Sequence, residues 1–219
     1  MPFKNLLNSL PDVKRKVRER KLKKNLKIIR ISKKFDKQYF DGTREYGYGG
    51  YKYDGRWKSV AKDIVSFFKL NKKNRILDVG CAKGFLVKDL LDLGMDAYGI
   101  DISKYAIKNS HLDVKDRVFL GNAKNISFPS NFFDSVISIN CIHNLKLIEC
   151  KKSIKEIMRV AKSNKNFIQV DSYRNKDEKK LFMDWVLTAE THFYTSKWTE
   201  FFSECGYNGY WNWTILKNK

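Results

Sequence analysis

Short apolar runs alternate with amphipathic stretches through the middle of the chain. Five runs have the length and composition of buried strands: 75–80, 96–103, 118–123, 132–140 and 166–173. Between them, apolar residues recur at helical spacing, which predicts helices over 81–94, 104–112 and 147–161. Alternating strands and helices favour a mostly parallel sheet with helices on both faces, so the pattern predicts an α/β fold.

The two ends of the chain depart from this alternation. Residues 58–70 predict a helix ahead of the first strand, and residues 13–34 predict a basic helix with scattered apolar positions. After the fifth strand come two helical segments and a final hairpin or strand, predicted at 177–189, 196–205 and 206–217. We expect an N-terminal arm and a glycine–aromatic segment over 1–57, and the α/β domain over 58–219.

Charge complicates this picture. The 219 residues carry a net charge of +20, and the first 34, with 13 Lys/Arg and two Asp/Glu, contribute +11 of it. Such an excess is typical of proteins that bind nucleic acid, yet arginine, the better reader of phosphate, is outnumbered by lysine. The arm is either a solvated helix packing a thin apolar stripe on the body, or a surface that contacts RNA or an anionic membrane.

Several protein classes are disfavoured. No apolar run reaches the roughly 18 residues of a membrane span. The N-terminus has no apolar h-region and no small-residue cleavage site, so we do not expect a secretory signal. Four cysteines lie far apart without a CxxC pair, which indicates reduced thiols rather than a disulfide framework or a metal site. We therefore expect a cytoplasmic protein without a bound metal. The sequence does not fix an oligomeric state.

The strongest chemical signal is LDVGCAKG, residues 77–84. A strand delivers Asp78, a tight turn uses Gly80 and Gly84, and a helix follows at once. A glycine lets the backbone approach a ligand closely, and the helix N-terminus offers free N–H groups. Asp101 ends the second strand 21 residues after Gly80, where a carboxylate can accept both hydroxyls of a ribose.

Two cofactor classes share this geometry, the dinucleotides and S-adenosylmethionine. A dinucleotide turn requires GxGxxG, whereas this chain has D-x-G-x-x-x-G. A carboxylate before the turn attracts an ammonium group and repels a pyrophosphate, so Asp78 favours S-adenosylmethionine. The alternative is that Asp78 only caps the turn through backbone N–H groups.

Taken together, these stretches resemble the class I S-adenosylmethionine-dependent methyltransferases of the small-molecule type, over residues 75 to about 217. LDVGCAKG is similar to the family's motif I, with Ala82 in place of its middle glycine, and Asp101 matches the acidic position after it. GNAKNISFP (121–129) resembles the adenine-side segment, which implies that Asn122 and Ala123 contact the adenine.

The resemblance carries further expectations. Cys81 and Ile102 lie in the matched stretches and are assigned with them to cofactor binding. FFDSVISINCIHNL (132–145) is similar to the motif IV strand and the turn after it, which places Asn140 beside the cofactor or the acceptor. The family fold implies seven strands, the last antiparallel and supplied by the C-terminal tail.

His143 is the candidate catalytic residue. It follows the fourth strand, near the expected position of the methyl group, and a histidine can take a proton from an attacking O–H or N–H group. A structural role is the alternative, because positioning alone supplies much of the rate of methyl transfer. Asp171, Tyr173, Trp185 and His192 are weaker candidates for lining the acceptor pocket.

GYGGYKYDGRW, residues 47–57, fits neither a helix nor a strand. Its position before motif I is where related enzymes cover the methionine end of the cofactor. Tyr48 and Tyr51 can face a sulfonium, and Arg56 can hold a carboxylate. The segment is read as an ordered lid, with a packed structural loop as the alternative.

Three functions remain open. The first is methyl transfer to an O or N atom of a small molecule, such as a sugar or other metabolite. The second is an RNA or protein methyltransferase that uses the basic arm, and the third is a non-catalytic partner subunit. The chain has Asn140-Cys141-Ile142-His143 where base-amine methyltransferases have D/N-P-P-Y/F/W, and it lacks a Pro-Cys pair, which favours the first.

Overall fold

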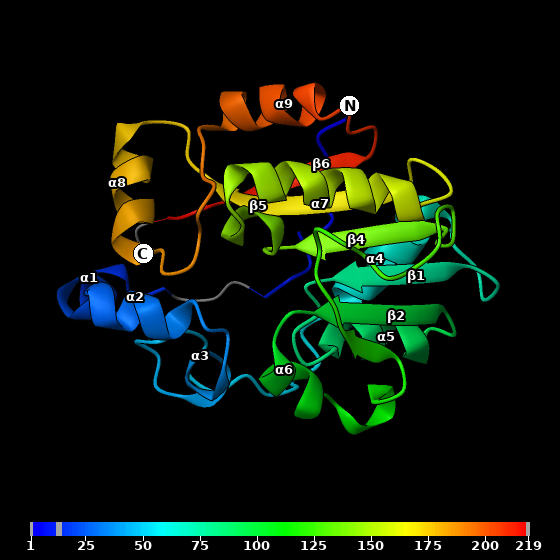
Figure 1. Cartoon of the computed structure of the whole chain (residues 1–219), viewed down its shortest axis with the longest axis horizontal. Coiled ribbons are helices and arrows are strands. Elements are labelled where there is room, and N and C mark those ends of the chain that lie inside the picture. The colour runs from blue at the N-terminus through cyan, green and yellow to red at the C-terminus, as the bar shows by residue number, and fades with distance from the viewer. Residues whose placement is uncertain (1, 12–14, 218–219) are drawn as a thin grey trace.

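A sheet of six strands forms the centre of the protein (Figure 1). The computed structural model describes residues 2–11 and 15–217. The strands follow the order β3-β2-β1-β4-β5-β6, and every neighbouring pair is parallel. They are β1 (Arg75–Val79), β2 (Asp96–Asp101), β3 (Val118–Leu120), β4 (Ser135–Ile139), β5 (Asn166–Ser172) and β6 (Tyr210–Ile215).

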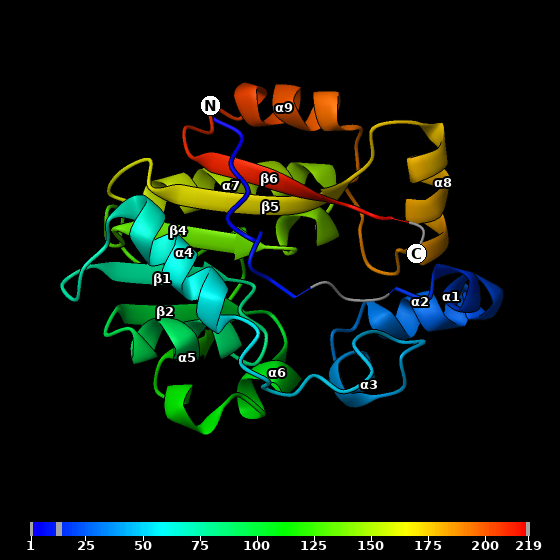
Figure 2. The same ribbon diagram turned by 180° about the vertical axis from the view of Figure 1, so that it is seen from behind.

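Helices cover both faces of this sheet (Figures 1 and 2). One face carries α4 (Lys58–Phe68) and α5 (Phe85–Asp92), and the other carries α7 (Leu147–Val160) and α9 (Thr195–Glu204). Successive strand residues point to opposite faces, so Ile76 packs in the cluster of α4 and α5, whereas Leu77 packs with α7 and α9. Because both faces of the sheet are buried, the sequences of the strands are almost continuous apolar runs.

The expected seven strands with an antiparallel last strand are wrong. The described residues form six strands, and β6 runs parallel to β5, with Phe167 opposite Tyr210. After β5 the chain passes through α8 (Lys176–Trp185) and then α9, which returns it to the end of the sheet where β5 begins. A crossover of this kind joins parallel strands, whereas an antiparallel strand would need a direct return.

The N-terminal residues reach the far edge of the sheet. Phe3 forms a parallel bridge with Trp211, and the N–H of Lys4 donates to the carbonyl of Trp211 at 3.0 Å. This contact covers part of the β6 edge, which would otherwise expose unpaired backbone groups.

The basic arm is two short helices, α1 (Val17–Lys23) and α2 (Leu26–Ser32), rather than the expected single helix over 13–34. Asn25 separates them because its side chain caps α2, accepting from the N–H of Ile28 at 3.0 Å. Residues 13 and 14 of the expected helix lie outside the described residues.

The remaining elements gather at one end of the sheet. They are α3 (Lys37–Asp41), α6 (Lys104–Lys108) and the 3₁₀ turns η1 (Leu112–Val114) and η2 (Ile142–Asn144). Figure 1 shows α1, α2, α3 and α8 beyond the carboxyl ends of the strands. Parallel sheets with this strand order bind ligands at that end, where the order reverses between β1 and β4. None of the helices in the described ranges is long and apolar enough to cross a bilayer.

Candidate functional site

The turn after β1 leaves no room for a side chain at Gly80. Its φ is +84°, and a Cβ there would lie 2.5 Å from the side chain of Cys141. Gly84 has a φ of +75° and begins α5, where a Cβ would lie 2.8 Å from Val114. Gly84 therefore serves the packing of α5, and it lines none of the three cavities described below.

The carboxylate of Asp101 holds this turn in place. One oxygen accepts from the N–H of Ala82 and the other from the N–H of Ser103, both at 2.8 Å. Burial raises the pKa of Asp101, and these hydrogen bonds oppose the rise. Ala82 has a φ of +52°, so the position where the family has a glycine keeps the left-handed backbone that a glycine favours.

A cavity of about 280 Å³, which we call the Asp101 cavity, opens beside this carboxylate. Most of the predicted cofactor positions line it, namely Gly80, Asp101, Ile102, Asn122, Ala123, Asn140 and Tyr48. Residues of α3 and the loop before it close the opposite wall, among them Phe35 and Tyr39. The side-chain oxygen of Asn122 accepts from the N–H of Lys124 at 3.1 Å, so it is partly committed to its own turn.

A smaller cavity of about 50 Å³, the Asp78 cavity, adjoins the first. Asp78 is 5% exposed, and its carboxylate forms no hydrogen bond with the described part of the chain. Burial, followed by the negative charge of Asp101, raises the pKa of Asp78 to about 7. The buried indole N–H of Trp57, in the same cavity, also finds no acceptor among these residues. Cys81 and Tyr51 complete the lining.

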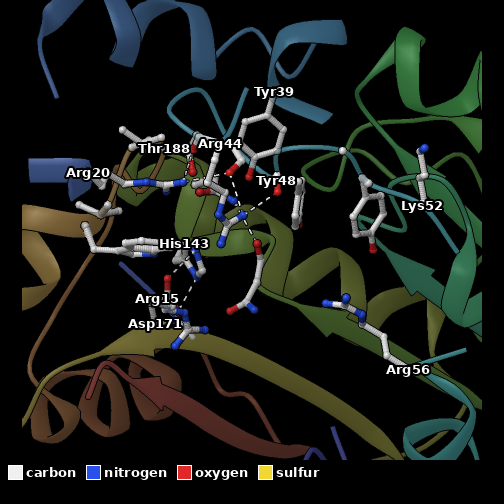
Figure 3. Close-up of a pocket in the computed structure, with 18 residues that line it drawn as sticks. Arg15, Arg20, Tyr39, Arg44, Tyr48, Lys52, Arg56, His143, Asp171 and Thr188 are labelled. Atoms are coloured by element: carbon white, nitrogen blue, oxygen red, sulfur yellow. Dashed lines mark hydrogen bonds and ion pairs between the residues drawn. The ribbon is translucent and has the colours of Figure 1, made fainter. Parts of the chain in front are cut away.

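The third cavity is the largest, at about 360 Å³, and its lining is basic (Figure 3). We call it the arginine cavity because four arginines and one lysine line it, against a single acidic residue: Arg15, Arg20, Arg44, Arg56, Lys52 and Asp171. Tyr39, Tyr48, Asn140 and Asn144 line both this cavity and the Asp101 cavity. The two spaces therefore adjoin.

Asn140 stands where the three cavities meet, since it lines all of them. It follows β4 and has a φ of +54°, a conformation that asparagine tolerates better than most residues. Its backbone is held by a hydrogen bond from its N–H to the carbonyl of Gln169 and by one from the amide of Asn144 to its carbonyl, both 3.0 Å. Its side-chain amide forms no hydrogen bond to any described residue.

His143 lines the arginine cavity but offers no free lone pair in this arrangement. Its Nδ1 accepts from the N–H of Asp171 at 3.2 Å, so the ring proton lies on Nε2, 3.8 Å from the Asp171 carboxylate. Burial lowers the pKa of His143, and Asp171 opposes the shift. The geometry therefore suits a residue that positions Asp171 more than it suits a general base. Trp185 also lines this cavity, whereas Tyr173 and His192 contact each other outside it.

The segment 47–57 is an ordered loop that forms part of all three cavity walls. Its N–H groups at Tyr48 and Gly50 donate to the carbonyls of Tyr39 and Phe40, which attaches it to α3. Tyr48 and Tyr51 pack with ring centroids 4.3 Å apart. Arg56 pairs with Asp54 and lines the arginine cavity, not the Asp78 cavity.

The basic arm packs against the segment after β5 and encloses the arginine cavity with it. The guanidinium of Arg20 lies 3.8 Å from the ring centroid of Trp185, and Lys21 pairs with Asp184 at 2.9 Å. Lys33 pairs with Glu190 at 2.5 Å. The arm thus forms a wall of the candidate site.

Sequence reasoning missed several residues of the site. Lys83, inside motif I, pairs with Asp41 of α3. Arg20 and Arg44 line the largest cavity, and Trp57 lines the smallest. The one available signal was that Arg20 is an arginine in a lysine-rich arm, because arginine is the residue preferred for buried and stacked cation sites.

Comparison with known proteins agrees with this geometry. A family model described as "Methyltransferase domain" matches residues 77–169, from motif I to β5. Residues 77–169 form a methyltransferase domain. The matched residues contain Asp78, Gly80, Asp101 and Asn140, which line the Asp101 and Asp78 cavities.

Individual relatives are more distant than the family match. The chain is 31% identical over 130 residues to a demethylmenaquinone methyltransferase of Symbiobacterium thermophilum, covering 54% of this chain and 50% of that protein. It is 27% identical over 151 residues to a sterol 4-C-methyltransferase of Caenorhabditis elegans, covering 64% and 44%. The chain thus spans about half the length of these curated relatives.

Solved structures support the fold. The YcgJ protein of Bacillus subtilis superposes with a TM-score of 0.54 at 19% identity, covering 66% of each chain. The methyltransferase domain therefore has a Rossmann-like α/β architecture with a parallel sheet.

Proposed function

We propose that this protein binds S-adenosylmethionine and transfers its methyl group to an O or N atom of a small-molecule acceptor. The observation that carries the proposal is the pairing of two carboxylates at adjoining cavities. Asp101 lies in a cavity of nucleoside size, and the unpartnered carboxylate of Asp78 lies in the small one. This division matches a ligand with a ribose at one end and an ammonium group at the other.

The residues present fit the cofactor at each of its parts. Asp101 would accept the ribose hydroxyls, and Ile102, Asn122 and Ala123 would contact the adenine. Asp78 would accept from the ammonium group, which relieves a buried charge without a partner. The orphaned N–H of Trp57 would donate to the carboxylate, a role that the sequence had suggested for Arg56.

The reacting atoms would meet beside Asn140, since this residue lines all three cavities. When bound, S-adenosylmethionine supplies an electrophilic methyl carbon. Asn140 and Tyr48 would hold the acceptor in line with that carbon, and the loop 47–57 would exclude water. His143 would fix Asp171, whose carboxylate orients an O–H or N–H group of the acceptor.

The RNA or protein acceptor receives less support. The arm residues Arg20, Lys21 and Lys33 contact the body of the protein. The arm therefore has a structural role that does not require binding to RNA or to another protein. We assign residues 1–57 to the arm and the lid, and residues 58–219 to the methyltransferase domain.

Transfer of a labelled methyl group from S-adenosylmethionine tests this function. The protein is incubated with a small-metabolite extract in one arm and with total RNA in the other. We expect label in the metabolite fraction, at a rate that depends on salt far less steeply than RNA binding does. Label confined to RNA, falling steeply with salt, would replace the small-molecule proposal with the RNA one.

A further inference from the structure

The arginine cavity holds more positive charge than the fold requires. Arg20 is only 9% exposed, and its guanidinium donates to two backbone carbonyls, those of Arg44 at 2.6 Å and Gly47 at 2.9 Å. No carboxylate pairs with Arg20 or Arg44 in the described part of the chain. A buried charge without a counterion is costly, and neutral carbonyls offset only part of that cost.

The arginines also repel one another. Burial first, and then the charges of Arg44 and Arg15, lower the pKa of Arg20 to about 10. Burial and Arg15 lower the pKa of Arg44 in the same way. The positive charges of these three guanidinium groups therefore repel one another, and an anion bound among them would reduce the repulsion.

These arginines keep donors free for such an anion. Arg20 uses only one terminal nitrogen, Nη2, and Arg44 only Nη1. The guanidinium of Arg15 contacts none of the described residues through a hydrogen bond. The remaining N–H groups suit the oxygens of a phosphate or carboxylate, which arginine binds through two parallel hydrogen bonds.

The cofactor does not need this group of arginines. Its single carboxylate belongs at the Asp78 cavity, which Arg20, Arg44 and Arg15 do not line. Figure 3 shows Arg20 and Arg56 on opposite sides of the arginine cavity. Arg20 and Arg44 lie over the ring of Trp185, at 3.8 and 5.4 Å from its centroid. Arg15 lines the same cavity, and Asn140 connects this space to the cofactor cavities.

We propose that the methyl acceptor is a small oxyanion, whose phosphate or carboxylate group binds Arg15, Arg20 and Arg44 while its reacting atom lies beside Asn140. This inference rests on the proposed function. Three arginines favour a group of more than one negative charge, such as a phosphate ester. The arm that carries Arg15 and Arg20 thus selects the acceptor.

The first test measures the site without knowing the acceptor. Pyrophosphate, inorganic phosphate and succinate are each titrated calorimetrically into the full chain. We expect saturable binding that Arg15→Gln and Arg44→Gln each weaken about tenfold to a hundredfold. Arg15→Gln leaves the described contacts intact, so it separates binding from folding. Arg18→Gln, an exposed change three residues further along the arm, is the matched control and leaves binding unchanged.

The outcomes are distinct. Phosphates binding more tightly than succinate identifies a phosphorylated acceptor, and the reverse identifies a carboxylate acceptor. No saturable binding at millimolar concentrations, or equal weakening by Arg18→Gln, overturns the inference. S-adenosylhomocysteine is titrated into the same samples. If the protein does not bind S-adenosylhomocysteine, the proposed function fails, whereas the result for anion binding is unaffected.

A second test follows the product. Metabolites labelled by the enzyme are separated by anion exchange at neutral pH. The inference predicts that the label is retained on the column and that Arg15→Gln raises the acceptor KM while the affinity for S-adenosylhomocysteine stays the same. Label that passes through uncharged overturns it.

Discussion

The ammonium of Lys83 lies 2.6 Å from the carboxylate of Asp41 and also donates to the carbonyl of Tyr51 at 3.0 Å. Lys83 belongs to the turn after β1, Asp41 ends α3, and Tyr51 belongs to the loop 47–57. A single side chain therefore joins this turn to both N-terminal elements. Although partial burial opposes it, hydrogen bonds from Lys83 and Tyr105 keep the pKa of Asp41 below its usual range.

Replacing Lys83 with methionine should loosen the lid. The substitution keeps the length of the side chain but leaves a half-buried carboxylate without its main partner, which costs about 1–3 kcal/mol. Chemical denaturation would show this loss, and proteolysis would show faster cleavage in 42–57. Lys197→Met removes an exposed helical pair and should change stability by less than about 0.5 kcal/mol. Equal stability of the two variants would contradict the joining role.

Asp78 should make cofactor-free stability depend on pH. Its folded pKa of about 7 lies above the ordinary 3.8, so between these values the folded state keeps a proton that the unfolded state releases. Stability is therefore lost as pH rises through this window. Asp78→Asn should be more stable than the parent at about pH 8, by on the order of 2–4 kcal/mol, and equal to it below about pH 4.

The same substitution should weaken S-adenosylhomocysteine binding, because the amide no longer balances the ammonium charge. Asp113→Asn, at an exposed carboxylate, is the control for both measurements. A stability difference between Asp78→Asn and the parent that stays constant from pH 4 to pH 8 would show that Asp78 does not titrate in this window.

Gly80→Ala should abolish cofactor binding and destabilise the fold. The new Cβ would meet Cys141 and would adopt a left-handed backbone, which together cost about 2–4 kcal/mol. Gly206 has a φ of +69° with open space around its Cβ position, so Gly206→Ala pays only the backbone cost of about 1–2 kcal/mol. Thermal unfolding measures the stability of the two variants. An equal loss of stability in both would mean that Cys141 can move aside without cost.

His143 should act through Asp171 rather than as a base. A glutamine at 143 can accept the Asp171 N–H through its oxygen and donate to the carboxylate, whereas leucine can do neither. We therefore expect His143→Gln to retain most of the labelled methyl transfer and His143→Leu to lose it. If His143→Gln loses as much methyl transfer as His143→Leu, and its residual activity no longer falls at low pH, His143 is a general base after all.

Local pattern was sufficient to predict five strands and most helices. Apolar runs such as RILDV and SVISI are buried on both faces, so their composition alone identifies them. The direction of β6 was not predictable in this way, because it depends on where α9 returns the chain and not on the residues of the strand. The single expected basic helix was wrong because Asn25 interrupts the pattern with a cap.

The proposed cofactor residues could be named from the sequence because most of them follow one another closely in motif I and after β2. The arginine cavity was not, since Arg20, Arg44 and Asp171 come from three segments that only the folded chain brings together. Lys83 illustrates the same limit, because its partner Asp41 lies 42 positions away in sequence. Contacts between distant segments are set by tertiary packing, which a short motif does not record.

Cofactor binding is tested most directly by a calorimetric titration of the purified protein with S-adenosylmethionine and S-adenosylhomocysteine. We expect saturable binding of both, with affinity reduced at least about tenfold in Asp101→Ala, which removes the proposed ribose contacts, and unchanged in Asp116→Ala, an exposed carboxylate. Absence of binding at millimolar ligand, or an Asp101→Ala variant that binds as tightly as the parent, would contradict this expectation.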